Sequence, residues 1–204
     1  MINIKTIPFP VCYILNNNKN MKRIIIVFTV SFLFLTASAQ KFMTQTGNIS
    51  FFSHTPIEDI KAYNNQVSSI LDISTGEIVF QVNIKSFKFE KALMEEHFNE
   101  NYMESEKYPR STFKGKILNT ESVDFTKTGK YDVKVEGDLE MHGVTNKVTV
   151  NGIIEVISGG INAASKFNIV PEDYKINIPG IVRDNIAKTL EVTITVKYTP
   201  LASK

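Results

Sequence analysis

The sequence predicts a single all-β domain built from antiparallel strands, and three observations support this prediction. Apolar and polar residues alternate with a period of two through at least seven segments after Gln40, which is typical of strands that bury one face. The connections between these segments are short and rich in turn residues, which favours hairpins. Only residues 91–103 break the alternation, and they carry a helical period instead.

Each expected strand has one apolar and one polar face. The seven strands are expected at residues 47–54, 77–84, 112–117, 130–140, 147–156, 161–169 and 190–198. The clearest is "KYDVKVEGDLE", in which Tyr131, Val133 and Val135 share one face and charged residues occupy the other. Sequences such as "STGE", "TKTG", "HGVTN" and "ISGG" join the strands and predict tight turns.

A one-sided sheet of this kind can bury its apolar face in two ways, as a sandwich or as a closed barrel. The two architectures differ in what they allow. A barrel of about eight strands has an interior that side chains fill or that holds one small ligand. The sequence shows no internal repeat and no linker between domains, so one domain is expected after the leader.

Residues 91–103 predict a short amphipathic helix. At about 100° per residue, one half of the helix carries Leu93, Met94, His97, Phe98, Asn101 and Tyr102. The other half carries Glu95, Glu96, Asn99 and Glu100, so these carboxylates are expected to face solvent. This pattern favours a helix that lies across an apolar surface.

The histidine in this helix raises the alternative of a metal or acid–base site. A zincin-type site needs a second histidine four residues after His97, and that position is Asn101. No serine, cysteine or paired carboxylate accompanies His97 in a recognisable motif. The other histidines, His54 and His142, lie next to turn residues. We therefore expect neither a metal site nor a catalytic site.

The amino-terminal segment is typical of a secretory leader. "MKRIIIVFTVSFLFLTASAQ" begins with Lys22 and Arg23, continues with the apolar run from Ile24 to Leu35, and ends in small residues. The apolar run is twelve residues long, whereas a membrane span takes about 20. We expect residues 1–39 to be a signal peptide region, with translation starting at Met21 and cleavage before Gln40.

The charge and cysteine content of the remaining chain exclude several classes of function. Removing residues 1–39 takes away four of the 23 basic residues and none of the 21 acidic ones, which leaves a net charge of −2. No basic surface for nucleic acid is then expected. The only cysteine, Cys12, lies in the leader, so the domain at 40–204 is expected to have no disulfide and no lipid attached to cysteine.

Several motifs make the chain similar to a known family. "LMEEHFNENYMESEKYPRSTFKG" is followed by "GKYDVKVEGDLEMHGVTNKVTV" and then by "FNIVPEDYKINIP". In this order and spacing they resemble the YceI-like family of exported bacterial proteins, over most of residues 45–198. One departure is "SHTPIEDIKAYNNQVSSILDISTG", which is short, polar and interrupted by Pro56, whereas larger members have a longer second strand here.

The resemblance implies an eight-stranded, lipocalin-like antiparallel barrel whose apolar interior holds an isoprenoid, quinone-like or fatty acyl lipid without catalysis or cofactor. It also implies an exported, periplasmic or secreted protein, and a homodimer is possible. The ligand-binding residues expected on this basis are Ile49, Phe51, Phe80, Val82, Ile84, Phe87, Phe89, Leu93, Met94, His97, Phe98, Phe113, Val133, Val135, Leu139, Val148, Val150 and Phe167. The alternative is a ligand-free barrel, plugged by its own side chains, that acts through its surface in interaction or stress protection.

Overall fold

The computed structural model of the chain describes residues 41–201. The expected signal peptide region at 1–39 and Cys12 lie outside these residues. None of the helices in the described range is long and apolar enough to span a membrane.

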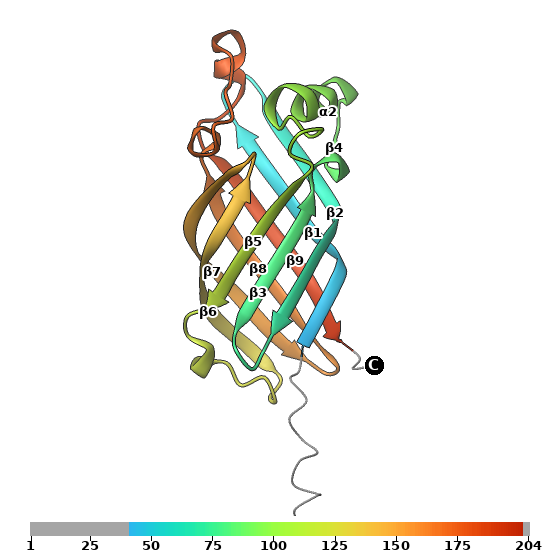
Figure 1. Cartoon of the computed structure of the whole chain (residues 1–204), viewed down its shortest axis with the longest axis vertical. Coiled ribbons are helices and arrows are strands. Elements are labelled where there is room, and N and C mark those ends of the chain that lie inside the picture. The colour runs from blue at the N-terminus through green and yellow to red at the C-terminus, as the bar shows by residue number, and fades with distance from the viewer. Residues whose placement is uncertain (1–40, 202–204) are drawn as a thin grey trace, which may run out of the picture. The chain divides into compact units, whose positions relative to one another are not determined.

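Eight antiparallel strands close into one barrel, which confirms the predicted fold class (Figure 1). The order around the barrel is β1-β2-β3-β5-β6-β7-β8-β9, and β9 pairs again with β1. The strands are β1 Lys41–His54, β2 Asp59–Asp72, β3 Glu77–Asn83, β5 Arg110–Ile117, β6 Gly129–Met141, β7 Val144–Ile157, β8 Gly160–Ile169 and β9 Leu190–Pro200. A two-residue strand, β4 (Lys88–Phe89), pairs with β2 beside the barrel.

The predicted helix is present but changes its winding partway. It runs as the α-helix α2 (Ala92–His97) and continues as the π-helical turn η2 (Phe98–Tyr102). Short 3-10 turns complete the structure: η1 Ile84–Ser86, η3 Thr120–Ser122, η4 Pro171–Tyr174 and η5 Gly180–Asn185. Figure 1 shows α2 at the end of the barrel where β1 finishes, together with the orange and red segment between β8 and β9.

The segment that seemed too polar for a long strand is the fourteen-residue strand β2. Pro56 lies before the strand, in the turn from β1, and therefore does not interrupt the pairing. The inward positions change phase along β2, because Ala62 and Asn64 are buried in its first half and Val67 and Leu71 in its second. A register shift against β1 near Gly47 accompanies this change, as in a β-bulge.

The turn between β2 and β3 shows why the predicted turn residues stand where they do. Asp72 Oδ1 accepts hydrogen bonds from the backbone N–H of Ser74 at 3.0 Å and from its hydroxyl. Gly76 has a φ of +73°, a conformation that residues with a Cβ rarely adopt, and its N–H donates to the Asp72 carbonyl at 2.8 Å. This turn sets the register from Asp72↔Glu77 onward.

Candidate functional site

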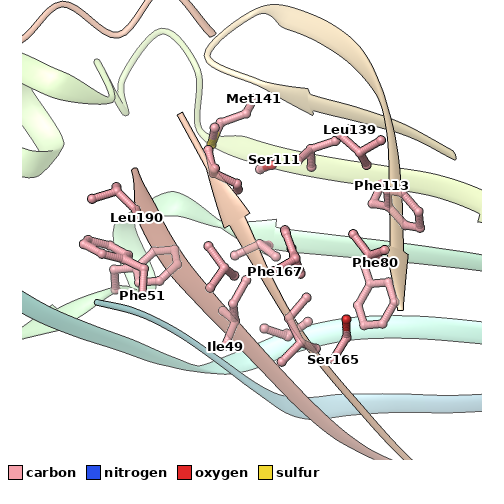
Figure 2. A pocket seen from close by; sticks show the side chains of 18 of the residues that line it. Ile49, Phe51, Phe80, Ser111, Phe113, Leu139, Met141, Ser165, Phe167 and Leu190 are labelled. Carbon is pink, nitrogen blue, oxygen red and sulfur yellow. The ribbon is translucent and has the colours of Figure 1, made fainter. Parts of the chain in front are cut away.

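The barrel encloses a cavity of about 350 Å³ that is lined almost entirely by apolar side chains. Every one of the eight barrel strands contributes to it, because successive side chains of a strand point alternately inward and outward. Figure 2 shows the rings of Phe51, Phe80, Phe113 and Phe167 entering this space from four different strands. A cavity of about 300–1,000 Å³ with such a lining is typical of a site for a small apolar ligand.

Most of the residues expected to bind ligand line this cavity. They are Ile49, Phe51, Phe80, Val82, Ile84, Phe87, Phe89, Met94, His97, Phe98, Phe113, Val133, Val135, Leu139, Val148, Val150 and Phe167. Leu93 does not line it, and its side chain is 60% exposed. The face of the helix that packs on the barrel follows Met94, Phe98 and Tyr102, so that Leu93 points away.

The cavity has further lining residues that the sequence did not reveal. Ile60, Val67 and Leu71 come from β2, whose alternation is hidden by its change of phase. Another group comes from the irregular segment between β8 and β9, where no strand pattern exists to mark it: Pro171, Ile176, Ile178, Val182, Asn185 and Ile186. Ile176 and Ile178, which alternate with polar residues in "YKINIP", are a signal that could have pointed to this segment.

The end of the barrel opposite α2 is filled by side chains, which we call the floor. Its buried members are Leu71, Ile78, Ile117, Val123, Val133, Val135, Ile154, Val156, Ile161, Val196 and Tyr198. Tyr198 is fully buried, and its hydroxyl lies 2.7 Å from Ser69 Oγ, which itself donates to the Val79 carbonyl at 2.8 Å. Burial raises the pKa of the Tyr198 hydroxyl far above its usual range, and the hydrogen bond with Ser69 opposes this only in part.

Two facing glycines shape the wall of the cavity beside Phe113. Gly115 of β5 pairs with Gly137 of β6. A Cβ on Gly137 would lie 2.4 Å from the Cα of Gly115 and 2.7 Å from Cζ of Phe113, which is closer than real Cβ atoms come. The missing side chains thus leave room for the Phe113 ring to lie against the wall of the cavity.

The residues Ala92–Tyr102, which we call the cap, close the other end through an aromatic cluster. Phe98 lies at ring-centroid distances of 5.0 Å from Phe89, 5.5 Å from Phe87 and 5.7 Å from Phe51. Such spacings are those of favourable aromatic pairs. Phe98 is the first residue of the π-helical turn, so the change in winding falls where the helix makes its central contact with the barrel.

Polar contacts around Glu58 fasten the cap to two neighbouring loops. Lys91, next to the cap, forms an ion pair with Glu58 at 2.7 Å, and Asn185 of η5 donates to the same carboxylate at 3.3 Å. The Lys91 and Asn185 hydrogen bonds lower the pKa of the Glu58 carboxyl below its usual value. The backbone N–H of Ala187 also donates to Ser53 Oγ at 2.8 Å. The β1–β2 turn, the cap and the η5 segment therefore meet at this end.

The three histidines have different surroundings. His97 is exposed at the rim of the cavity, and His54 Nδ1 lies 2.6 Å from Asp59 Oδ1. His142 has a mostly buried ring whose Nδ1 lies 3.1 Å from the Tyr174 carbonyl oxygen and whose Nε2 lies 2.9 Å from Glu104 Oε2. Residues 41–201 contain no group of three or more His, Cys, Asp or Glu side chains arranged to hold a metal ion.

Comparisons with known proteins agree with this geometry. A similar solved structure is a polyisoprenoid binding domain from Saccharophagus degradans, with a TM-score of 0.66 and 14% identity over 80% of this chain and 99% of that one. BcnA from Burkholderia cenocepacia has a TM-score of 0.63 at 14% identity, over 75% and 96% of the two chains. The YCEI protein of Campylobacter jejuni has a TM-score of 0.56 at 18% identity, over 74% and 90%.

At these identities the solved structures establish the common fold, whereas the sequence itself establishes the family. A search of curated protein sequences found no relative of the chain. The model of the YceI-like domain matches residues 28–198, which is most of the chain. The chain therefore belongs to the YceI-like family.

Proposed function

We propose that the protein is an exported carrier that holds a long isoprenoid, quinone-like or acyl lipid in its barrel and performs no chemistry on it. The observation that carries this proposal is the apolar cavity of about 350 Å³, closed by the floor at one end and covered by the cap at the other. A solved structure with the same fold is described as a polyisoprenoid binding domain, which supports the choice of lipid class.

The lining favours a chain over a polar ligand. Its polar residues include Glu58 and Asn185, which are hydrogen-bonded to each other beside the cap, and Ser53, which accepts from the backbone N–H of Ala187. The lining carboxylate and the amide are thus already partnered, as are the hydroxyls of Ser111 and Ser165, which donate to backbone carbonyls. Most of the remaining lining is apolar. A lipid chain matches such a surface because it demands no hydrogen bond in return.

Energetics set a minimum length for the chain. Each buried methylene contributes about 0.8 kcal/mol, and association costs on the order of 4–15 kcal/mol. A chain of roughly ten methylenes therefore gains about 8 kcal/mol and barely offsets this cost, whereas a chain twice as long exceeds it. The proposed ligand is accordingly a long prenyl or acyl chain, with its polar end at the rim.

Native mass spectrometry followed by organic extraction tests this function. The protein is purified from the exported fraction of a bacterial host, and its mass also tests the predicted cleavage before Gln40. The expected result is a bound mass that leaves on denaturation and fragments as a prenyl or acyl lipid. A bare polypeptide, unchanged after incubation with host lipids, would refute the carrier function and favour a protein that acts through its surface.

A further inference from the structure

The barrel wall is incomplete between β7 and β8. These strands pair only from Gly152↔Ser165 to Ile157↔Gly160. Beyond Gly152, β7 continues to Val144 and stays paired with β6, and β8 continues to Ile169 and stays paired with β9. We call the two unpaired stretches, residues 144–151 of β7 and 166–169 of β8, the seam.

A second, open pocket lies at the seam and shares part of its lining with the cavity. It has a volume of about 580 Å³ and is lined by both unpaired stretches, together with Val170, Asp173 and Tyr174. Four of its lining residues also line the main cavity: Val148, Val150, Phe167 and Ile169. The pocket in the wall and the cavity inside the barrel thus lie on the two sides of the same four side chains.

Burial along the same two strands decreases from their paired part toward the seam. Where β7 and β8 pair, Ile154 and Ile161 are almost completely buried, with exposures of 2% and 1%, whereas Ala163, nearer the seam, is partly buried. The inward-facing residues of the seam, Val148, Val150 and Phe167, are only partly buried. Because no β7–β8 pairing covers these three residues, the pocket in the seam reaches apolar side chains that face the lumen.

Side-chain hydrogen bonds lie at the two ends of the seam but not in its middle. At one end Ser165 donates to the Asn151 carbonyl at 2.6 Å, and at the other Asn146 donates to the Asp173 carbonyl at 2.8 Å. The cap, in contrast, is held by the Phe98 cluster and by the bonds that converge on Glu58. The cap end is thus fastened by side chains, whereas the middle of the seam has no side-chain bond across it among the described residues.

We propose that the seam is the entrance through which the lipid chain passes sideways into the barrel. This inference rests on the proposed carrier function and adds the route that the ligand takes. The alternation of β7 suits this role, because Val148 and Val150 offer an apolar path inward while Lys147 and Thr149 face the water outside. A polar head group can then stay hydrated while the chain slides between the strands.

Reversible cross-linking tests the route. Thr149→Cys and Asn168→Cys place one thiol on each exposed side of the seam, and a cleavable bismaleimide joins them. One matched control, Glu155→Cys with Asn162→Cys, joins the same strands where they already pair. A second pair, Lys88→Cys with Glu95→Cys, joins the cap to β4, where these two side chains form an ion pair at 2.6 Å. All variants carry Cys12→Ser and are isolated from the exported fraction, and the rate of uptake of a fluorescent long-chain fatty acid is measured.

The expected result is that the seam cross-link slows uptake and release at least about tenfold, because the wall must then open locally to admit the chain. Cleaving the linker restores the rate, which excludes misfolding as the cause, and the two control cross-links leave it unchanged. Slowing by the cap cross-link alone would overturn the proposal and place the route at the cap. If the protein without any cross-link takes up no probe, the carrier function itself fails, and the entrance with it.

Discussion

A carboxylate placed inside the cavity is expected to abolish lipid retention, and Phe80→Asp is the most informative such change. Phe80 lines the cavity and is partly buried, with its ring 6.4 Å from that of Phe113. In the empty barrel water can reach an aspartate there, so the variant is expected to fold. When a lipid chain fills the cavity, the carboxylate loses this water without gaining a partner.

The magnitude follows from the cost of removing a carboxylate from water. After relaxation this cost is still several kcal/mol per ion, which corresponds to a loss of affinity of roughly a hundredfold or more. Phe80→Ala separates charge from size, because it removes the ring but adds no charge and should retain most of the binding. Val79→Asp is the matched control, since Val79 directly precedes Phe80, faces outward and is 41% exposed.

Lipid extracted per mole of protein, with a titration of a fluorescent long-chain fatty acid, measures the effect. Circular dichroism and urea unfolding check that each variant is folded. If folded Phe80→Asp retains as much lipid as Val79→Asp, the cavity does not hold the chain and the reasoning is refuted.

Three further predictions concern the cap, the wall and the floor. Phe98→Ala removes three aromatic contacts of about 0.5–1.5 kcal/mol each, so amide hydrogen exchange should become faster in Ala92–Tyr102 but not in the floor; unchanged exchange would contradict the role of the cluster. Gly137→Ala overpacks the wall and should lower the free energy of unfolding in urea by about 1–3 kcal/mol, and a more stable variant would show that the predicted clash is absent. Because the folded pKa of Tyr198 is raised, its contribution to stability is complete below the unfolded pKa of about 10 and falls above it by roughly 1.4 kcal/mol per pH unit. Tyr198→Phe should flatten this alkaline decline in thermal unfolding, and an equally steep decline in the variant would disprove its origin.

The strands that the sequence predicted most clearly are those in which one face contacts the barrel interior and the other contacts water along the whole strand. β6 is the best example, with Val133 and Val135 buried and their neighbours Asp132 and Lys134 exposed. Such a pattern needs no knowledge of the partner strand, because burial alone selects the residue type at each position. The choice between sandwich and barrel was not open to this argument, since it depends on the pairing of β1 with β9.

The sequence pattern did not reveal β2, because the partners of its buried polar residues are known only from the tertiary structure. Two of its buried positions are polar, and each is satisfied by a partner far along the chain. Asn64 donates to the Asn83 carbonyl at 2.9 Å, and Ser69 meets Tyr198. A buried asparagine looks like a solvent-exposed residue until its partner is known. The orientation of Leu93 also depends on a tertiary contact, because the packing of Phe98 against the barrel decides which side of the helix faces inward.

The pairing of β1 with β9 has a consequence for how the protein folds. Every other step around the wall joins barrel strands that follow one another in the chain, whereas this step joins the first to the last. Such a distant contact forms only after the entropy of a very long loop has been lost, which slows folding. During synthesis the wall stays open until the eleven residues of β9 arrive. A chain interrupted before Leu190 would therefore expose its cavity-facing residues as an unclosed and aggregation-prone sheet.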